Sequence, residues 1–157
     1  MSRNPQVSLE TTLHIRDHCL CLHAQRAARA LARRFDEAFR PLGLTSGQFS
    51  LLVSLNRPEP PNLRSVAALL AMDRTTLTAA LKPLERRGWI DIAVDDQDRR
   101  SRRLSLTAAG RRLLARAVPV WQRAHAELDG LHKGGDAGRL RADLGALTSA
   151  RSLSGTR

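Results

Sequence analysis

The sequence is poor in the residues on which several classes of protein depend. Of its 157 residues none is Tyr, and only three are Phe and two are Trp, so few rings are available for stacking on single-stranded bases. Its two cysteines, Cys19 and Cys21, lie too close in sequence for a good intramolecular disulfide. These shortages argue against an RNA-stacking protein and against a disulfide-stabilised secreted fold.

Long apolar runs and catalytic motifs are also missing. No segment approaches the roughly 18–20 apolar residues of a membrane-spanning helix, and the first ten residues have no apolar core of a secretory signal. We therefore expect a soluble, cytoplasmic protein with no membrane partner. No Ser/His/Asp or Cys/His arrangement, glycine-rich phosphate loop or zinc-ligand pair is present, which predicts no catalytic residues, no metal site, no cofactor and no enzymatic activity.

Positive charge is abundant. Lys and Arg number 26 against 15 Asp and Glu, which gives a net charge of +11. Nucleic acid is the first partner to expect, because each phosphate contact releases condensed counterions and adds affinity. An Arg-rich compositional bias of the source is the alternative explanation. The length and the 42% hydrophobic content predict one folded domain over residues 1–157.

The N-terminal part predicts helices. Residues 12–40 contain neither Pro nor Gly and are rich in good helix formers, and their apolar residues recur at steps of three and four. One long helix is expected there, long enough to reach another chain. The sequence Pro41-Leu42-Gly43-Leu44 ends it, and Thr45 is expected to cap a second helix that runs to about Leu55.

The middle of the chain predicts a helix-turn-helix. From Leu63 the sequence LRSVAALLAMDRTTLTAALKPLERRG indicates a short helix, a tight break at Met72-Asp73 and a second helix that ends at Gly88. Asp73 is the expected N-cap of the second helix, and Pro83 is expected to bend its C-terminal half. The expected core residues of this region are Leu77, Ala80, Leu81, Leu84, Trp89 and Ile92.

A β-hairpin is expected next. The sequences WIDIAV and RRLSL alternate large apolar with small or polar residues, and the polar loop DDQDRRS separates them. Thr107 then caps a helix that runs to about Leu131 and is interrupted by Pro119. A last amphipathic stretch covers 139–147, and residues 149–157 are expected to fray.

This order of elements resembles the MarR family of bacterial winged helix-turn-helix regulators. The similarity covers about Thr12 to Leu147, and its most specific part is the match of DDQDRRSRRLSLTAAG to the family pattern D-x-R-[SA]-x-x-x-x-L-T, through Asp98, Arg100, Ser101, Leu106 and Thr107. The resemblance implies a mainly α fold with a small β-hairpin wing. It also implies a DNA-binding lobe over 45–107 and dimerisation helices over 12–40 and 108–148.

The resemblance further implies a homodimer. Apolar residues on the last helices suit a shared bundle, namely Leu113, Leu114, Val118, Trp121, Leu128, Leu140, Leu144 and Leu147. Two-fold symmetry predicts a palindromic double-stranded DNA operator, with half-sites about one helical turn apart.

The candidate DNA-contacting residues follow from groove geometry. A helix can enter the major groove while a basic hairpin tip reaches the adjacent minor groove. Arg74 is the main candidate for base readout, and Asp98 is expected to hold the Arg beside it by a charge-assisted bond. The candidates are Arg74, Thr75, Thr76 and Thr78 early in the recognition helix, Lys82 and Arg86 on phosphates, and Asp98, Arg99, Arg100, Arg102 and Arg103 in the wing. The alternatives are that the threonines only cap the helix and that the wing arginines form a solvated tip.

Cys19 and Cys21 are the candidate sensor. Cys21 lies where the resemblance to the peroxide-sensing branch of the family places a reactive cysteine, but the tyrosines expected near it are absent. Three interpretations stay open: a thiol sensor, a soft-metal site with nearby His, and two small buried apolar side chains. The family resemblance also implies a small aromatic or phenolic effector.

The sequence as a whole predicts a sequence-specific DNA-binding transcriptional regulator, a homodimeric repressor released by a small-molecule effector or by thiol oxidation. One alternative is an architectural protein that binds DNA without sequence preference, and another is a winged helix that docks protein.

Overall fold

The computed structural model describes residues 6–96, 98–131 and 136–149. Its helices and strands are α1 (Leu9–His18), α2 (Leu20–Phe39), the 3-10 helix η1 (Arg40–Leu42), α3 (Ser46–Leu55), α4 (Leu63–Leu69), α5 (Arg74–Arg86), β1 (Ile90–Val94), β2 (Arg102–Leu106), α6 (Ala108–Leu131) and α7 (Ala137–Ser149). Over these described residues the fold is mainly helical with one two-stranded antiparallel sheet, as predicted. Among the described residues, no helix combines the length and the apolarity that crossing a bilayer requires.

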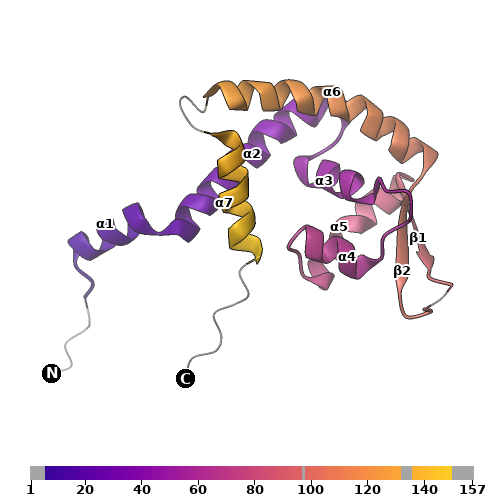
Figure 1. The fold of residues 1–157 in the computed structure, drawn as a ribbon, viewed down its shortest axis with the longest axis horizontal. Helices are drawn as coiled ribbons and strands as arrows, with labels where there is room; N and C mark the ends of the chain where they lie inside the picture. The colour runs from indigo at the N-terminus through magenta and orange to yellow at the C-terminus, as the bar shows by residue number, and fades with distance from the viewer. Residues whose placement is uncertain (1–5, 97, 132–135, 150–157) are drawn as a thin grey trace.

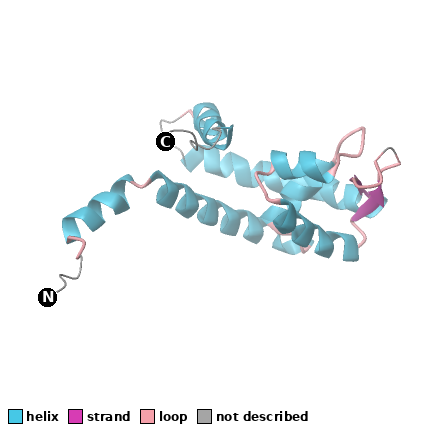
Figure 2. Ribbon diagram, turned by 90° about the horizontal axis from the view of Figure 1, so that it is seen from below, coloured by secondary structure: helices cyan, strands magenta, loops and turns pink. Residues whose placement is uncertain are grey.

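Two long helices and a compact lobe make up the molecule. Helices α2 and α6 run side by side, and α3, α4, α5 and the hairpin gather against one end of that pair (Figures 1 and 2). The α1 helix extends away from this body at the other end (Figure 1). The lobe is therefore attached to a long helical arm rather than to a second globular core.

The core lies where the lobe meets the two long helices. Phe39 and Leu52 are fully buried, and the rings of Phe39 and Phe49 stack with centroids 4.7 Å apart. The predicted core residues of the recognition region are found there: Leu77, Leu81 and Leu84 are buried, and Ala80, Trp89 and Ile92 are half-buried against them. Leu113 and Leu114, expected at a dimer contact, are also buried in this core of the chain itself.

The prediction of one continuous helix over 12–40 is wrong. Cys19 has extended backbone angles, with φ −73° and ψ 103°, and separates α1 from α2. Its thiol sulfur accepts the backbone N–H of Leu22 over 3.4 Å, so Cys19 caps α2. Because neither Pro nor Gly marks the break, helix propensity alone could not locate it.

Pro119 does not interrupt α6, contrary to expectation. The helix continues through it from Ala108 to Leu131. Ala117 and Ala124 are buried on the face that packs toward α2 and α3, so packing on both sides of the proline holds the helix despite the missing donor. The final helix extends slightly beyond the predicted 139–147, while the expected fraying of 149–157 lies almost entirely outside the described residues.

The predicted helix caps are confirmed. Thr45 and Gln48 form a reciprocal capping box at the start of α3, and the Asp73 carboxylate accepts the N–H of Thr76 at the start of α5. Gly88 follows α5 with φ +65°, a conformation that side chains other than glycine rarely adopt. These local signals give α3 and α5 their observed ends.

Gly110 permits the first turn of α6 to contact the start of the hairpin. A Cβ on Gly110 would lie 2.0 Å from the carbonyl oxygen of Trp89. Thr107 holds the same junction, since its hydroxyl donates to the Gly88 carbonyl over 2.6 Å and accepts the Gly110 N–H. The wing and α6 are therefore in direct backbone contact.

We expect Gly110→Ala to lower the free energy of unfolding by about 2 kcal/mol or more, because the clash involves backbone that cannot rotate away. Chemical denaturation measures this. The matched control is Gly47→Ala in α3, where an added Cβ meets nothing within 4 Å and helix propensity favours Ala by roughly 0.5–1 kcal/mol. Equal stability of the two variants would contradict the close contact.

Candidate nucleic-acid interface

Helix α5 has one buried and one exposed face. Leu77, Leu81 and Leu84 are buried in the lobe. The opposite face is exposed and carries candidate residues spaced three or four apart, namely Thr75, Thr78, Lys82 and Arg86. Four candidates thus share one stripe that points away from the core.

The first turn of α5 is organised by Asp73. Its carboxylate accepts the Thr76 hydroxyl over 2.6 Å and the Thr76 N–H over 2.8 Å, and these bonds lower the pKa of the Asp73 carboxyl. The cap is therefore intact above the unfolded carboxyl pKa and is lost only as the pH falls through the lowered value. Thr76 serves the cap, whereas the Thr78 hydroxyl donates to the Arg74 carbonyl over 2.8 Å.

The wing is a regular hairpin. Strands β1 and β2 pair from Ile90 opposite Leu106 to Val94 opposite Arg102. At the tip, the Ser101 N–H donates to the Asp98 carbonyl over 2.8 Å. The Asp98 carboxylate accepts the backbone N–H of Arg100 over 3.0 Å, so the expected bond from Asp98 to a neighbouring guanidinium is replaced by a turn that fixes the backbone.

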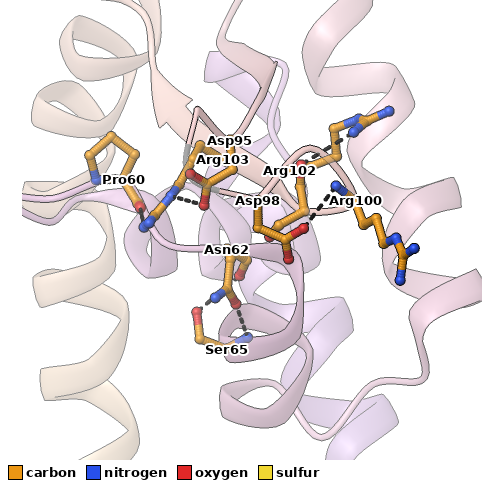
Figure 3. Close-up of polar contacts among 9 residues, drawn as sticks. Pro60, Asn62, Ser65, Asp95, Asp98, Arg100, Arg102 and Arg103 are labelled. Atoms are coloured by element: carbon orange, nitrogen blue, oxygen red, sulfur yellow. Dashed lines mark hydrogen bonds and ion pairs between the residues drawn. The ribbon is translucent and has the colours of Figure 1, made fainter.

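The ion pair of the wing is formed by Asp95 and Arg103. The Arg103 Nε lies 2.7 Å from the Asp95 Oδ2, and the Asp95 side chain is only 9% exposed. Arg103 also donates to the Pro60 carbonyl over 3.0 Å (Figure 3). Arg103 therefore belongs to the stem of the wing, where it holds the hairpin against the segment that leads into α4.

The remaining wing arginines are exposed at the tip. Arg102 donates to the carbonyls of Arg99 and Ser101 over 3.3 and 3.2 Å. The side chain of Arg100 extends away from the Asp95–Arg103 pair (Figure 3). Arg99, Arg100 and Arg102 thus offer guanidinium groups to an external partner.

A basic cleft of about 280 Å³ separates the wing from the helix-turn-helix. It brings together Arg74 from the start of α5 with Arg100 and Arg102 from the wing. The full lining is Leu63, Arg64, Ala67, Arg74, Asp98, Arg100, Ser101 and Arg102. Sequence reasoning missed Arg64, although a cation in the first turn of a helix-turn-helix was a usable signal.

The wall of this cleft formed by α4 is tied to the wing. The Leu104 N–H donates to the Pro61 carbonyl over 2.9 Å, and Asn62 forms a β-bridge with Arg103. The Asn62 side chain also caps α4 by accepting the Ser65 N–H over 2.8 Å (Figure 3). The proline-containing segment 58–62, between α3 and α4, therefore aligns with the edge of the hairpin.

The candidate sensor residues lie far along the chain from this interface, at the junction of α1 and α2. Cys19 is half-buried and Cys21 is exposed in the single chain, so contacts within this chain do not bury the two thiols. The Gln25 amide donates to the Cys21 sulfur over 3.1 Å. In the described part of the chain, no three His, Cys, Asp or Glu side chains gather as a metal site would require.

Comparisons with known proteins agree with this geometry. The MarR family pattern matches residues 44–101. The crystal structure of the M. tuberculosis transcriptional regulator MosR in complex with DNA superposes with a TM-score of 0.76 at 37% identity, covering 83% of this chain and 94% of that one. The chain belongs to the MarR family. It is a winged helix-turn-helix transcriptional regulator. Because the family consists of transcriptional regulators and not of enzymes, the prediction that the chain is not an enzyme is confirmed.

Two further relatives are similar to this MarR-family chain. The repressor CouR of Rhodococcus jostii RHA1, bound to a 23-mer DNA duplex, is 28% identical with a TM-score of 0.74, covering 91% of this chain and 99% of that one. The transcriptional activatory protein BadR of Rhodopseudomonas palustris is 35% identical over 55% of this chain and 51% of its own length. The chain thus spans about half the length of that curated relative.

We expect Arg103→Ala to lower the free energy of unfolding by about 1–3 kcal/mol, because it removes the guanidinium that pairs with the poorly exposed Asp95 carboxylate and donates to the Pro60 carbonyl. Arg99→Ala removes an exposed side chain of the same type and is expected to change stability by less than about 0.5 kcal/mol. Urea denaturation measures both variants. Identical midpoints would show that the ion pair does not hold the wing.

Proposed function

We propose that this MarR-family chain binds double-stranded DNA sequence-specifically as a homodimer and represses transcription. The observation that carries the proposal is the continuity of one exposed basic surface from α5 across the cleft to the wing tip. Family membership and the DNA-bound relatives support it.

Each part of this surface suits a different part of DNA. The exposed stripe of α5 is narrow enough to enter the major groove, where Arg74, Thr75 and Thr78 reach base edges and Lys82 and Arg86 reach phosphates. The side chain of Thr76 stays hydrogen-bonded to Asp73. Thr76 therefore acts on DNA indirectly, by holding the first turn of α5 that contacts it. Arg99, Arg100 and Arg102 enter the adjacent minor groove, whose negative potential attracts guanidinium groups, while Asp98 shapes the turn that presents them.

Residues 45–107 act as the DNA-binding lobe, and 12–40 with 108–148 as the dimerisation region. Helices α1 and α7 bury none of their described side chains in the chain itself. They expose large apolar residues, namely Leu9, Leu13, Ile15, Leu140, Leu144 and Leu147. A second copy covers this surface by two-fold symmetry, which requires a palindromic operator with half-sites about one helical turn apart.

In the proposed homodimer, release from DNA follows from a change in the distance between the DNA-binding lobes of the two protomers. An effector acts only if it binds one spacing more tightly than the other. We propose either a small aromatic molecule or oxidation of Cys19 or Cys21 as that signal. The thiols lie where α1 meets α2, so modification there would alter how the two helices join.

Titration of DNA from upstream of the protein's own gene, at two salt concentrations and with unrelated competitor DNA, tests the function. We expect tight, competitor-resistant binding by the wild type, and a loss of about tenfold or more for Arg100→Ala. Arg123→Ala removes the same charge from an exposed position of α6, outside the α5 stripe, the cleft and the wing, and is expected to retain both affinity and dimer mass. Weak binding that is equal on all sequences would favour the architectural alternative, and no salt-sensitive DNA binding would favour a protein-docking winged helix.

We expect Leu144→Asp to convert the homodimer to a monomer, because a carboxylate in an apolar interface is costly to desolvate. Operator affinity should fall about 100-fold or more, since linked half-site binding is lost. Analytical ultracentrifugation measures the mass, and circular dichroism checks the fold. Leu69→Asp, at a similarly exposed leucine in the lobe, should leave the mass unchanged. A dimeric Leu144→Asp variant would remove α7 from the proposed interface.

A further inference from the structure

Arg64 has no role in the function proposed so far. It lies in the first turn of α4 and is exposed, and its side chain lines the basic cleft between α5 and the wing. Among the described residues no carboxylate forms an ion pair with it. The guanidinium is therefore available to an anion from outside the chain.

The position of the cleft limits what that anion can be. Adjacent major and minor grooves of DNA are separated by one sugar-phosphate backbone. A protein that places a helix in one groove and a hairpin in the next must let that backbone pass between the two elements. In this chain the space between Arg74, at the start of α5, and Arg100, at the wing tip, is the basic cleft.

We infer that Arg64 binds a phosphate of the backbone strand that separates the two grooves. This inference rests on the proposed DNA binding and adds a third contact element, α4, to α5 and the wing. Guanidinium groups bind phosphate oxygens through paired N–H donors. The charges of the cleft agree, because one carboxylate opposes a set of four guanidinium groups, those of Arg64, Arg74, Arg100 and Arg102.

The cleft is built before DNA arrives. The Asn62–Arg103 bridge and the bond from Leu104 to Pro61 fix the start of α4 against the stem of the wing. Arg64 comes two residues after Asn62, so its backbone position is fixed by the same contacts. A phosphate that enters the cleft is therefore met by residues of α4, α5 and the wing whose backbone positions are already set.

The test compares Arg64→Ala, Arg64→Lys and Arg123→Ala, each titrated on the operator and on unrelated DNA over a series of salt concentrations. We expect Arg64→Ala to weaken binding to both DNAs by the same factor, about tenfold or more. The slope of log affinity against log salt should fall by about one, as loss of one phosphate contact predicts. Arg64→Lys keeps the charge and should restore most of the slope. Arg123→Ala loses the same charge from an exposed position of α6, outside the α5 stripe, the cleft and the wing, and should behave as the wild type. Thermal denaturation should show all three variants folded, and analytical ultracentrifugation should show all three with the mass of the wild type.

The outcomes separate this inference from the function on which it rests. If the wild type shows no preference for any DNA, the proposed function fails and the role of Arg64 fails with it. If the wild type binds specifically and Arg64→Ala matches Arg123→Ala, the function stands and the phosphate contact is wrong. If Arg64→Ala weakens only operator binding and leaves the unrelated DNA unaffected, Arg64 acts on base recognition and the backbone assignment is overturned.

Discussion

The ion pair between Asp95 and Arg103 fixes the relation of the wing to the rest of the lobe. Its carboxylate is nearly enclosed, and its guanidinium reaches across to the Pro60 carbonyl. Two hairpin residues and the linker before α4 are thus joined through a single side chain. The position of the wing tip relative to α5, and the width of the cleft between them, depend on this contact. A hairpin of two short strands has little stability alone, so the anchor matters more here than in a larger sheet.

The arginines of this chain divide into two groups that composition does not distinguish. Arg103 binds a carboxylate, Arg34 pairs with Glu127 between α2 and α6, and Arg87 donates to the Gly43 carbonyl while stacking over Trp89. These side chains hold elements together. The guanidinium groups around the cleft have little acidic competition and remain directed outward. The net charge of +11 therefore suggested that the chain binds nucleic acid. Only the hydrogen bonds and ion pairs of each arginine indicate which of these charges are available to DNA.

Most local signals were read correctly from the sequence, with Pro119 as an exception, and contacts between distant segments were not. The Asp73 cap, the Thr45 capping box and the strand boundaries depend on neighbours within a few residues, so the sequence contains the whole signal. The break at Cys19 depends on a weak sulfur cap without Pro or Gly. The choice of Asp95 rather than Asp98 as the arginine partner depends on hairpin register. Arg64 was visible in the sequence as a cation at the start of a predicted helix, but its place beside the wing was not, because it depends on the pairing of residues 61 and 62 with β2.

Because Gly110 contacts the Trp89 backbone directly, α6 and the wing move together as one rigid unit. With 24 residues, the helix is about 36 Å long. Its first turn is fixed to the start of β1, and its far end lies beside α2. A tilt of about 5° over that length displaces one end by roughly 3 Å relative to the other, which is comparable to the spacing of neighbouring base pairs. A small change among the long helices is therefore enough to move the lobe out of register with DNA, without any rearrangement inside the lobe.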